Sequence, residues 1–162
     1  MQKKTPVKSY FTSKNFGVGF KEDPTSKFKI YSSARCVNAP ESYFKHTEDM
    51  DKYKVYVGHY IVSNQVIHIL PPNVAAVRED CLLGFGTKEY CESMRSYYQC
   101  KLIWYLVYMT NCGNAGKEAF VNVPDPGAFD HIFTDDELYK KYNLTQDEIN
   151  IIESVIKERK SK

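Results

Sequence analysis

Polar and apolar residues alternate along much of the N-terminal two-thirds of the chain. Basic or polar residues take turns with apolar, β-prone residues in Lys27–Tyr31 and in Lys52–Val57, which is the period of two that half-buried strands show. The alternation predicts that the lysines of these strands project on one side. A short apolar run, Cys81–Phe85, predicts another strand.

A hairpin is predicted between these strands. Two β-prone runs, Tyr60–Val62 and Val66–Ile69, are separated by Ser63–Gln65, whose residue types favour a tight turn. Pro71–Asn73 then ends the second run, because proline cannot donate a ladder hydrogen bond.

A helical pattern follows the predicted strands. Thr87 is placed to cap a helix that runs to Tyr98, and the apolar run Leu102–Met109 continues it, so we expect one helix packed across a sheet. Asn111–Gly116 ends the helix with small, turn-forming residues. Beyond it, Ala119–Val123 predicts one more strand.

Two helix starts are marked in the C-terminal segment. Thr134 with Glu137, and Thr145 with Glu148, have the spacing of capping boxes, and apolar residues flank each pair as a hydrophobic staple. Together the elements predict an α+β fold, with a mixed or antiparallel sheet, a central helix and two C-terminal helices. The second of these helices is expected to bury Ile149, Ile152, Val155 and Ile156.

Length and composition favour a single domain. A chain of 162 residues, 43% of them hydrophobic, is long enough for one core, so we expect one domain over residues 1–162 with 1–11 as a flexible basic lead-in. The longest apolar run, Leu102–Met109, is shorter than the roughly 20 residues of a membrane span. The five cysteines are an odd number and form no Cys-x-x-Cys pair. We therefore expect a cytoplasmic protein with reduced thiols and no membrane partner.

Charge is distributed unevenly along the chain. Residues 1–36 hold eight Lys or Arg against two acids, a net charge of +6, whereas residues 121–162 hold six against nine, a net charge of −3. This asymmetry indicates a basic face that could meet a polyanion and an acidic, solvated C-terminal region.

Catalytic motifs are missing from the sequence. An adenine methyltransferase needs a short Asn or Asp, Pro, Pro, aromatic loop to hold the extruded adenine, and Pro71–Asn73 has such residues in the wrong order. Gly84–Gly86 lacks the third glycine and the distant acid of a nucleotide-binding fingerprint, and is more typical of a tight turn. Cys81, Cys91 and Cys100 lie in apolar runs, where thiols are usually inert. We expect no catalytic residue in this chain.

Metal ligands are missing as well. No histidine or cysteine pair has the spacing of a zinc site, so we expect no metal and treat the histidines as surface or capping residues. Glu153 and Lys157 are expected to form an ordinary i,i+4 ion pair rather than part of a magnesium site. The four histidines are His46, His59, His68 and His131.

Without catalytic or metal-binding motifs, the remaining candidate is a surface that recognises nucleic acid. Lysines beside aromatic residues could contact phosphates, and amide or guanidinium groups could address base edges. The candidate DNA-binding residues are Lys14, Asn15, Lys27, Lys29, Arg35, Lys52, Lys54, Asn64 and Gln65.

Several segments of the chain resemble segments of one protein family, and they occur in the same order along the sequence. Phe120–Pro126 is similar to its final strand and Val-Pro loop, and Phe133–Ile149 to its Trp-Thr-Asp-Glu-Glu-Leu-Tyr-like helix start and Leu-Thr-like cap, with Phe133 where tryptophan is common. Ser13–Val18, Asp51–Val55 and Cys100–Val107 resemble its Phe-Gly entry, Lys-Tyr-Lys-Val strand and Thr-Lys-Phe helix. The chain thus resembles, over about residues 12–157, the C-terminal target-recognition region of type II and type IIG restriction-modification adenine-specific DNA methyltransferases.

The resemblance implies a DNA-reading part of a larger bacterial restriction enzyme. It implies double-stranded DNA and a methyltransferase or nuclease catalytic domain as partners, with S-adenosylmethionine bound by that missing domain and no cofactor bound here. We therefore expect that this chain alone is not an enzyme. Two alternatives stay open: an interaction module that joins subunits of a restriction complex without touching bases, and a small nuclease or independent transferase.

Overall fold

The computed structural model describes part of the chain. Its backbone is described for residues 8–9, 27–32, 37–38, 42–43, 51–58, 61–72, 74–77, 81–110, 117–120 and 122–157. Side chains are described for residues 51–58, 61–72, 83–110, 119–120 and 122–157.

The first sheet is antiparallel and has the strand order β1-β8-β5-β6. The strand predictions at Lys52–Val57 and Cys81–Phe85 are confirmed, and β5 lies between β8 and β6. Two residues of the expected lead-in form β1, at the edge of this sheet. The strands are β1 (Lys8–Ser9), β5 (Tyr53–Val57), β6 (Ile67–Leu70) and β8 (Cys81–Gly86).

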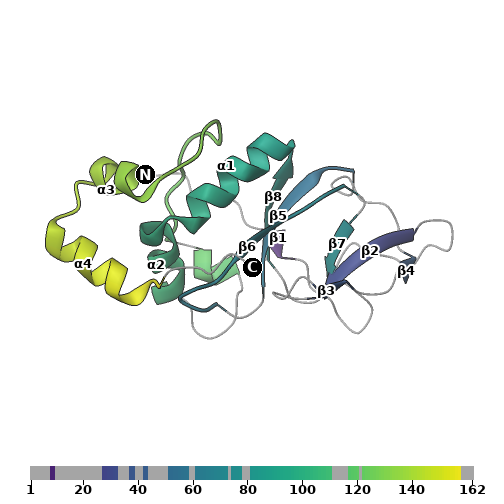
Figure 1. Cartoon of the computed structure of the whole chain (residues 1–162), viewed down its shortest axis with the longest axis horizontal. Coiled ribbons are helices and arrows are strands. Elements are labelled where there is room, and N and C mark those ends of the chain that lie inside the picture. The colour runs from purple at the N-terminus through teal and green to yellow at the C-terminus, as the bar shows by residue number, and fades with distance from the viewer. Residues whose placement is uncertain are drawn as a thin grey trace.

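The second sheet is mixed and is built around β2 (Lys27–Ser32), which confirms the strand predicted at Lys27–Tyr31. β2 is antiparallel to β3 (Val37–Asn38) and β4 (Ser42–Tyr43), and parallel to β7 (Val74–Val77). The sequence did not predict β7, because a four-residue run with two alanines after prolines has little β signal of its own. In Figure 1 this sheet lies at one end of the molecule and helices α3 and α4 at the other.

The predicted hairpin is wrong in one of its arms. Gln65 N–H donates to the Val62 carbonyl at 3.1 Å, so the turn exists, but Ile61 and Val62 are not in a strand. β6 pairs with β5 instead. Ile61 is buried in the core without pairing, and the Val62 carbonyl accepts from Trp104 Nε1 at 2.8 Å, so side-chain packing overrides the β propensity of this run.

Helix α1 (Lys88–Gln99) packs against β5, β6 and β8, as expected for a helix across a sheet (Figure 1). Thr87 caps it, since its hydroxyl accepts from Tyr90 N–H at 3.2 Å. The expected continuation is wrong: the backbone leaves the helical conformation at Cys100, with ψ 137°, and α2 (Lys101–Thr110) starts anew. Asp135 Oδ1 accepts from Lys101 N–H at 2.5 Å and satisfies an amide at the start of α2.

The strand predicted at Ala119–Val123 is also wrong. Lys117–Phe120 forms a 3₁₀ helix, η2, and Val123 N–H donates to the Phe120 carbonyl at 3.2 Å. Ala119, Phe120 and Val123 are all buried. A strand would place Phe120 and Val123 on opposite faces, whereas the turn lets both enter the same core.

Helices α3 (Asp135–Lys141) and α4 (Gln146–Val155) confirm the two starts predicted in the C-terminal segment. The capping box at Thr145 is present in both directions. At the first start, the Thr134 hydroxyl accepts from Glu137 N–H at 3.3 Å, but the Glu137 carboxylate bonds His131 instead of completing a box. Phe133 and Leu138 are buried as the staple pattern predicts.

Helix α4 buries a narrower stripe than the sequence predicted. Ile152 and the capping residue Ile156 are buried, while Ile149 and Val155 are half-buried. The ion pair predicted between Glu153 and Lys157 is wrong: Glu153 Oε1 lies 3.1 Å from Lys101 Nζ, because α4 packs on α2.

The α+β class, with a central helix and two C-terminal helices, is confirmed. No helix in the described ranges is both long and apolar enough to cross a bilayer.

Thr145→Ala should lower the free energy of unfolding by about 1 kcal/mol, because it removes the cap of α4 and one side of its capping box. Urea unfolding followed by circular dichroism measures the change. Gln146→Ala, at the next residue, is the control and should be nearly neutral, since alanine is a good helix former. Equal stabilities of Thr145→Ala and wild type would mean that the cap does not stabilise α4.

Candidate functional site

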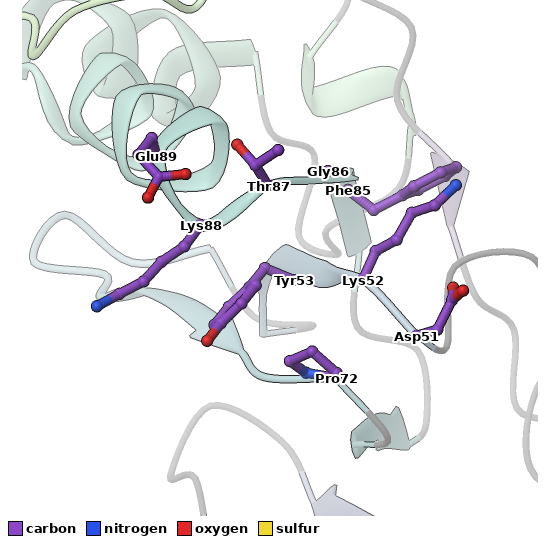
Figure 2. A pocket seen from close by; sticks show the side chains of 9 residues that line it. All are labelled: Asp51, Lys52, Tyr53, Pro72, Phe85, Gly86, Thr87, Lys88 and Glu89. Atoms are coloured by element: carbon purple, nitrogen blue, oxygen red, sulfur yellow. The ribbon is translucent and has the colours of Figure 1, made fainter.

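A groove of about 660 Å³ opens where the first sheet meets the start of α1. Its walls come from the segment leading into β5, the segment leaving β6, and the turn from β8 into α1. The lining residues are Asp51, Lys52, Tyr53, Pro72, Phe85, Gly86, Thr87, Lys88 and Glu89, all shown in Figure 2.

One wall of the groove carries a lysine held over an aromatic ring. Lys52 Nζ lies 5.1 Å from the centroid of Phe85, within the range of a cation–π contact. Figure 2 shows the Lys52 side chain running alongside Phe85, while Tyr53 extends to the other side above Pro72. Lys52 is exposed, so its ammonium stays accessible to an anion.

The N-terminus of α1 forms the opposite wall, and its first turn is already capped. Thr87 accepts from Tyr90 N–H, and hydrogen bonds from the Glu89 backbone N–H and from Thr87 lower the pKa of the Glu89 carboxyl. Glu89 is therefore ionised at neutral pH and repels a second anion from the helix end. Lys88 projects away from Lys52 and pairs loosely with Glu92 at 3.7 Å (Figure 2). Anion contact in the groove falls mainly to Lys52.

The prediction that Lys54 is a surface residue is wrong. The alternating pattern predicted that it would project on one side with the other lysines, but it is only 3% exposed. Its Nζ donates to the Lys52 carbonyl at 2.8 Å and to the Pro71 carbonyl at 3.4 Å. The pattern fails because β5 is a central strand in which every residue from Lys54 to Val57 is buried.

The other candidate DNA-binding residues are spread along the chain. Gln65 is 4% exposed, which removes it from the expected surface, whereas Asn64 beside it is exposed. The Asn64 turn precedes β6 and the groove follows it, so the two lie at opposite ends of that strand. Lys27 and Lys29 lie in β2, and Lys29 is in register with Val74 of β7, two residues beyond Pro72. Lys14, Asn15 and Arg35 lie outside the described residues.

Sequence reasoning missed most of the groove. Tyr53 was predicted only as a strand residue, and the tight turn predicted at Gly84–Gly86 is wrong, because these residues are the last three of β8. The available signal was the pair of lysines flanking Tyr53, but only the β5–β8 pairing, which sets Tyr53 opposite Gly86, brings Phe85 to Lys52.

A second polar cluster surrounds His131. Its Nδ1 lies 2.8 Å from Asp130 Oδ1 and its Nε2 lies 2.9 Å from Glu137 Oε1. The ring packs on Phe133 with centroids 4.1 Å apart, and the His131 carbonyl accepts from Ser93 Oγ at 2.5 Å. Because both ring nitrogens already face carboxylates, the cluster is suited to hold the loop on α1 rather than to activate a nucleophile.

The Cys91 thiol and the Tyr97 hydroxyl are two reactive groups that are buried on α1. Burial raises the pKa of the Cys91 thiol to about 11, so the thiolate nucleophile is scarce at neutral pH. Burial also raises the pKa of the Tyr97 hydroxyl, which donates to the Pro124 carbonyl at 2.6 Å. The described residues contain no group of three or more His, Cys, Asp or Glu that could hold a metal ion.

Comparison with known proteins finds no matching family, no matching curated protein and no matching solved structure.

The His131 cluster predicts a pH-dependent stability. Hydrogen bonds that the ring donates to the carboxylates of Asp130, first, and Glu137 raise the pKa of His131, so the folded state favours the imidazolium. The resulting stability is fully present below the unfolded-state pKa, about 6.5, and is lost as the pH rises through the folded-state pKa. The melting temperature of wild type should therefore exceed that of His131→Gln at about pH 5.5, by a margin that shrinks toward about pH 8.

Asp130→Asn supplies the matched variant. An NMR titration should show the pKa of His131 falling toward its ordinary value, since one of the two carboxylates is gone. A His131→Gln melting difference that stays constant with pH would contradict this account.

Proposed function

We propose that this chain is a double-stranded-DNA recognition domain, the target-recognition part of a bacterial restriction-modification adenine methyltransferase located in the cytoplasm. The ordered sequence resemblance over about residues 12–157 supports the family, and the Lys52–Phe85 pair in the groove is the structural observation that carries the binding proposal. A separate catalytic domain would bind S-adenosylmethionine and act on the adenine.

The groove is suited to contact with a DNA backbone. The Phe85 ring restrains Lys52, so less side-chain entropy is lost when its ammonium meets a phosphate. Such contacts fix orientation without reading sequence, which leaves base recognition to other groups. The exposed Asn64 amide at the far end of β6 is one such group in the described residues, and the basic segment 1–36 supplies further cations.

A subunit-joining role is the second candidate. The observation that favours it is the presence of large apolar side chains at the surface near the C-terminal helices. Ile132 is 60% exposed just before α3, and Ile151 is 54% exposed on α4. Both could pack against another subunit of a restriction complex.

Lys52→Gln should weaken binding to a fluorescently labelled duplex and lower the slope of log affinity against log salt by about 0.9, because one phosphate contact is lost. Fluorescence anisotropy across a salt series starting at low ionic strength measures both quantities. Lys140→Gln is the control, since Lys140 is an exposed lysine on α3, which lies at one end of the molecule and away from the start of α1 (Figure 1).

Identical slopes for wild type and Lys52→Gln would exclude a phosphate contact at the groove. If wild type also fails to bind duplex at low salt, the subunit-joining role becomes the better proposal. Ile151→Glu should then abolish association with a co-expressed catalytic subunit.

The purified chain should transfer no methyl group and cut no DNA by itself, because its sequence has neither an adenine-holding loop nor a cofactor fingerprint. Incubation with S-adenosylmethionine carrying a labelled methyl group, followed by counting of the DNA, tests this. Label on DNA above that of a protein-free control would overturn the proposal that catalysis belongs to another domain.

A further inference from the structure

A buried lysine lies directly behind the groove. Lys54 is 3% exposed, and its Nζ contacts two backbone carbonyls, Lys52 O at 2.8 Å and Pro71 O at 3.4 Å. The first carbonyl belongs to the segment that enters β5 and the second to the segment that leaves β6. We call this arrangement the lysine clasp.

The clasp joins the segments that flank β5 and β6, beyond the last residues that pair between these two strands. The ladder between β5 and β6 ends with Lys54 opposite Leu70, so Lys52 and Pro71 lie past it. Lys52 lines the groove, and Pro71 precedes Pro72, which also lines it. The Lys54 ammonium therefore links the backbone of both groove segments where the strand ladder no longer does.

A buried ammonium group needs oxygen acceptors close to it. Lysine has three N–H donors and no acceptor, and its desolvated charge must be compensated by oxygen atoms at hydrogen-bonding distance. Charge-assisted bonds to carbonyls are stronger than neutral ones, so they hold the Lys52 carbonyl in place. Holding that carbonyl restrains the peptide plane that follows Lys52, and so limits the directions in which the Lys52 side chain can leave the backbone.

We propose that Lys54 is a positioning residue for DNA binding: through the lysine clasp it sets the backbone of Lys52 so that the Lys52 ammonium stays over Phe85 and faces a phosphate. The inference rests on the proposed function. Lys54 is buried and cannot reach DNA itself, so it acts through its exposed neighbour Lys52.

The test is a double-variant cycle with Lys54→Met and Lys52→Gln. The full chain is titrated into a labelled duplex of about 30 base pairs, three helical turns, and melting curves are recorded for each variant. Lys54→Met should weaken binding about threefold to tenfold, as Lys52→Gln does, and the double variant should bind no more weakly than Lys52→Gln. Lys54→Arg, which keeps the charge and the donors, should restore most of the affinity.

Additive losses in the double variant, or an unchanged affinity for Lys54→Met, would overturn the positioning role. A general loss of structure would weaken binding in both backgrounds alike, so non-additivity separates positioning from stability. If Lys54→Met does not fold, Lys54→Gln takes its place under the same criteria, because its amide retains a donor on a shorter side chain.

A second readout needs no DNA. The NMR shift of the Lys52 ε-methylene protons reports the ring current of Phe85, and Lys54→Met should move this shift toward the value of a free lysine while Lys140→Gln leaves it unchanged. A moved shift in a protein that binds no duplex would support the clasp and overturn the DNA proposal. An unmoved shift would overturn the clasp, whatever the protein binds.

Discussion

The packing of α1 against the first sheet is the contact on which the described structure depends. A Cβ atom built on Gly84 of β8 would lie 2.5 Å from Met94 Cε, so the end of the Met94 side chain fills the space that the missing side chain leaves. Cys91, Met94, Tyr97 and Tyr98 bury the inner face of the helix. Both ends of α1 are consequently fixed, and each end builds a different part of the molecule.

At its C-terminal end, α1 organises the helical layer. The chain turns at Cys100 into α2, and Asp135 caps that helix from the start of α3. Ser96 Oγ accepts from Phe133 N–H at 2.9 Å, which fastens the preceding loop to α1. Lys101 then pairs with Glu153 of α4. The C-terminal helices are therefore held to the core by polar contacts at their ends as well as by the buried residues between them.

The parts predicted correctly from the sequence are those that depend on neighbours along the chain. The caps at Thr87, Thr134 and Thr145 need only residues within one turn, so their spacing was sufficient. The predictions failed where tertiary contacts determine the local structure. Asp135 ends the expected long helix from 34 residues away, and Trp104 bonds a carbonyl in the expected hairpin from 42 residues away. No local pattern contains those partners.

The same distinction applies to the candidate site. Periodicity identified Lys52 and Lys54 as a pair, but a period of two says which residues share a side of a strand and not whether that side is covered. In the structure one lysine faces the groove and the other is buried behind it.

The charges explain why the exposed lysine matters most at the groove. Asp51 and Glu89 line the groove with Lys52 and Lys88, so the formal charges of its lining balance. Glu89 is bound to the first turn of α1 and Lys88 is drawn toward Glu92, so these two charges are directed to the helix. The buried Lys54 adds a positive charge behind the opposite wall, in surroundings where charges are screened less than in water. On the Lys52 wall Asp51 offsets one of the two lysines, so one formal positive charge remains there, which is where the backbone of a polyanion would make its first contact.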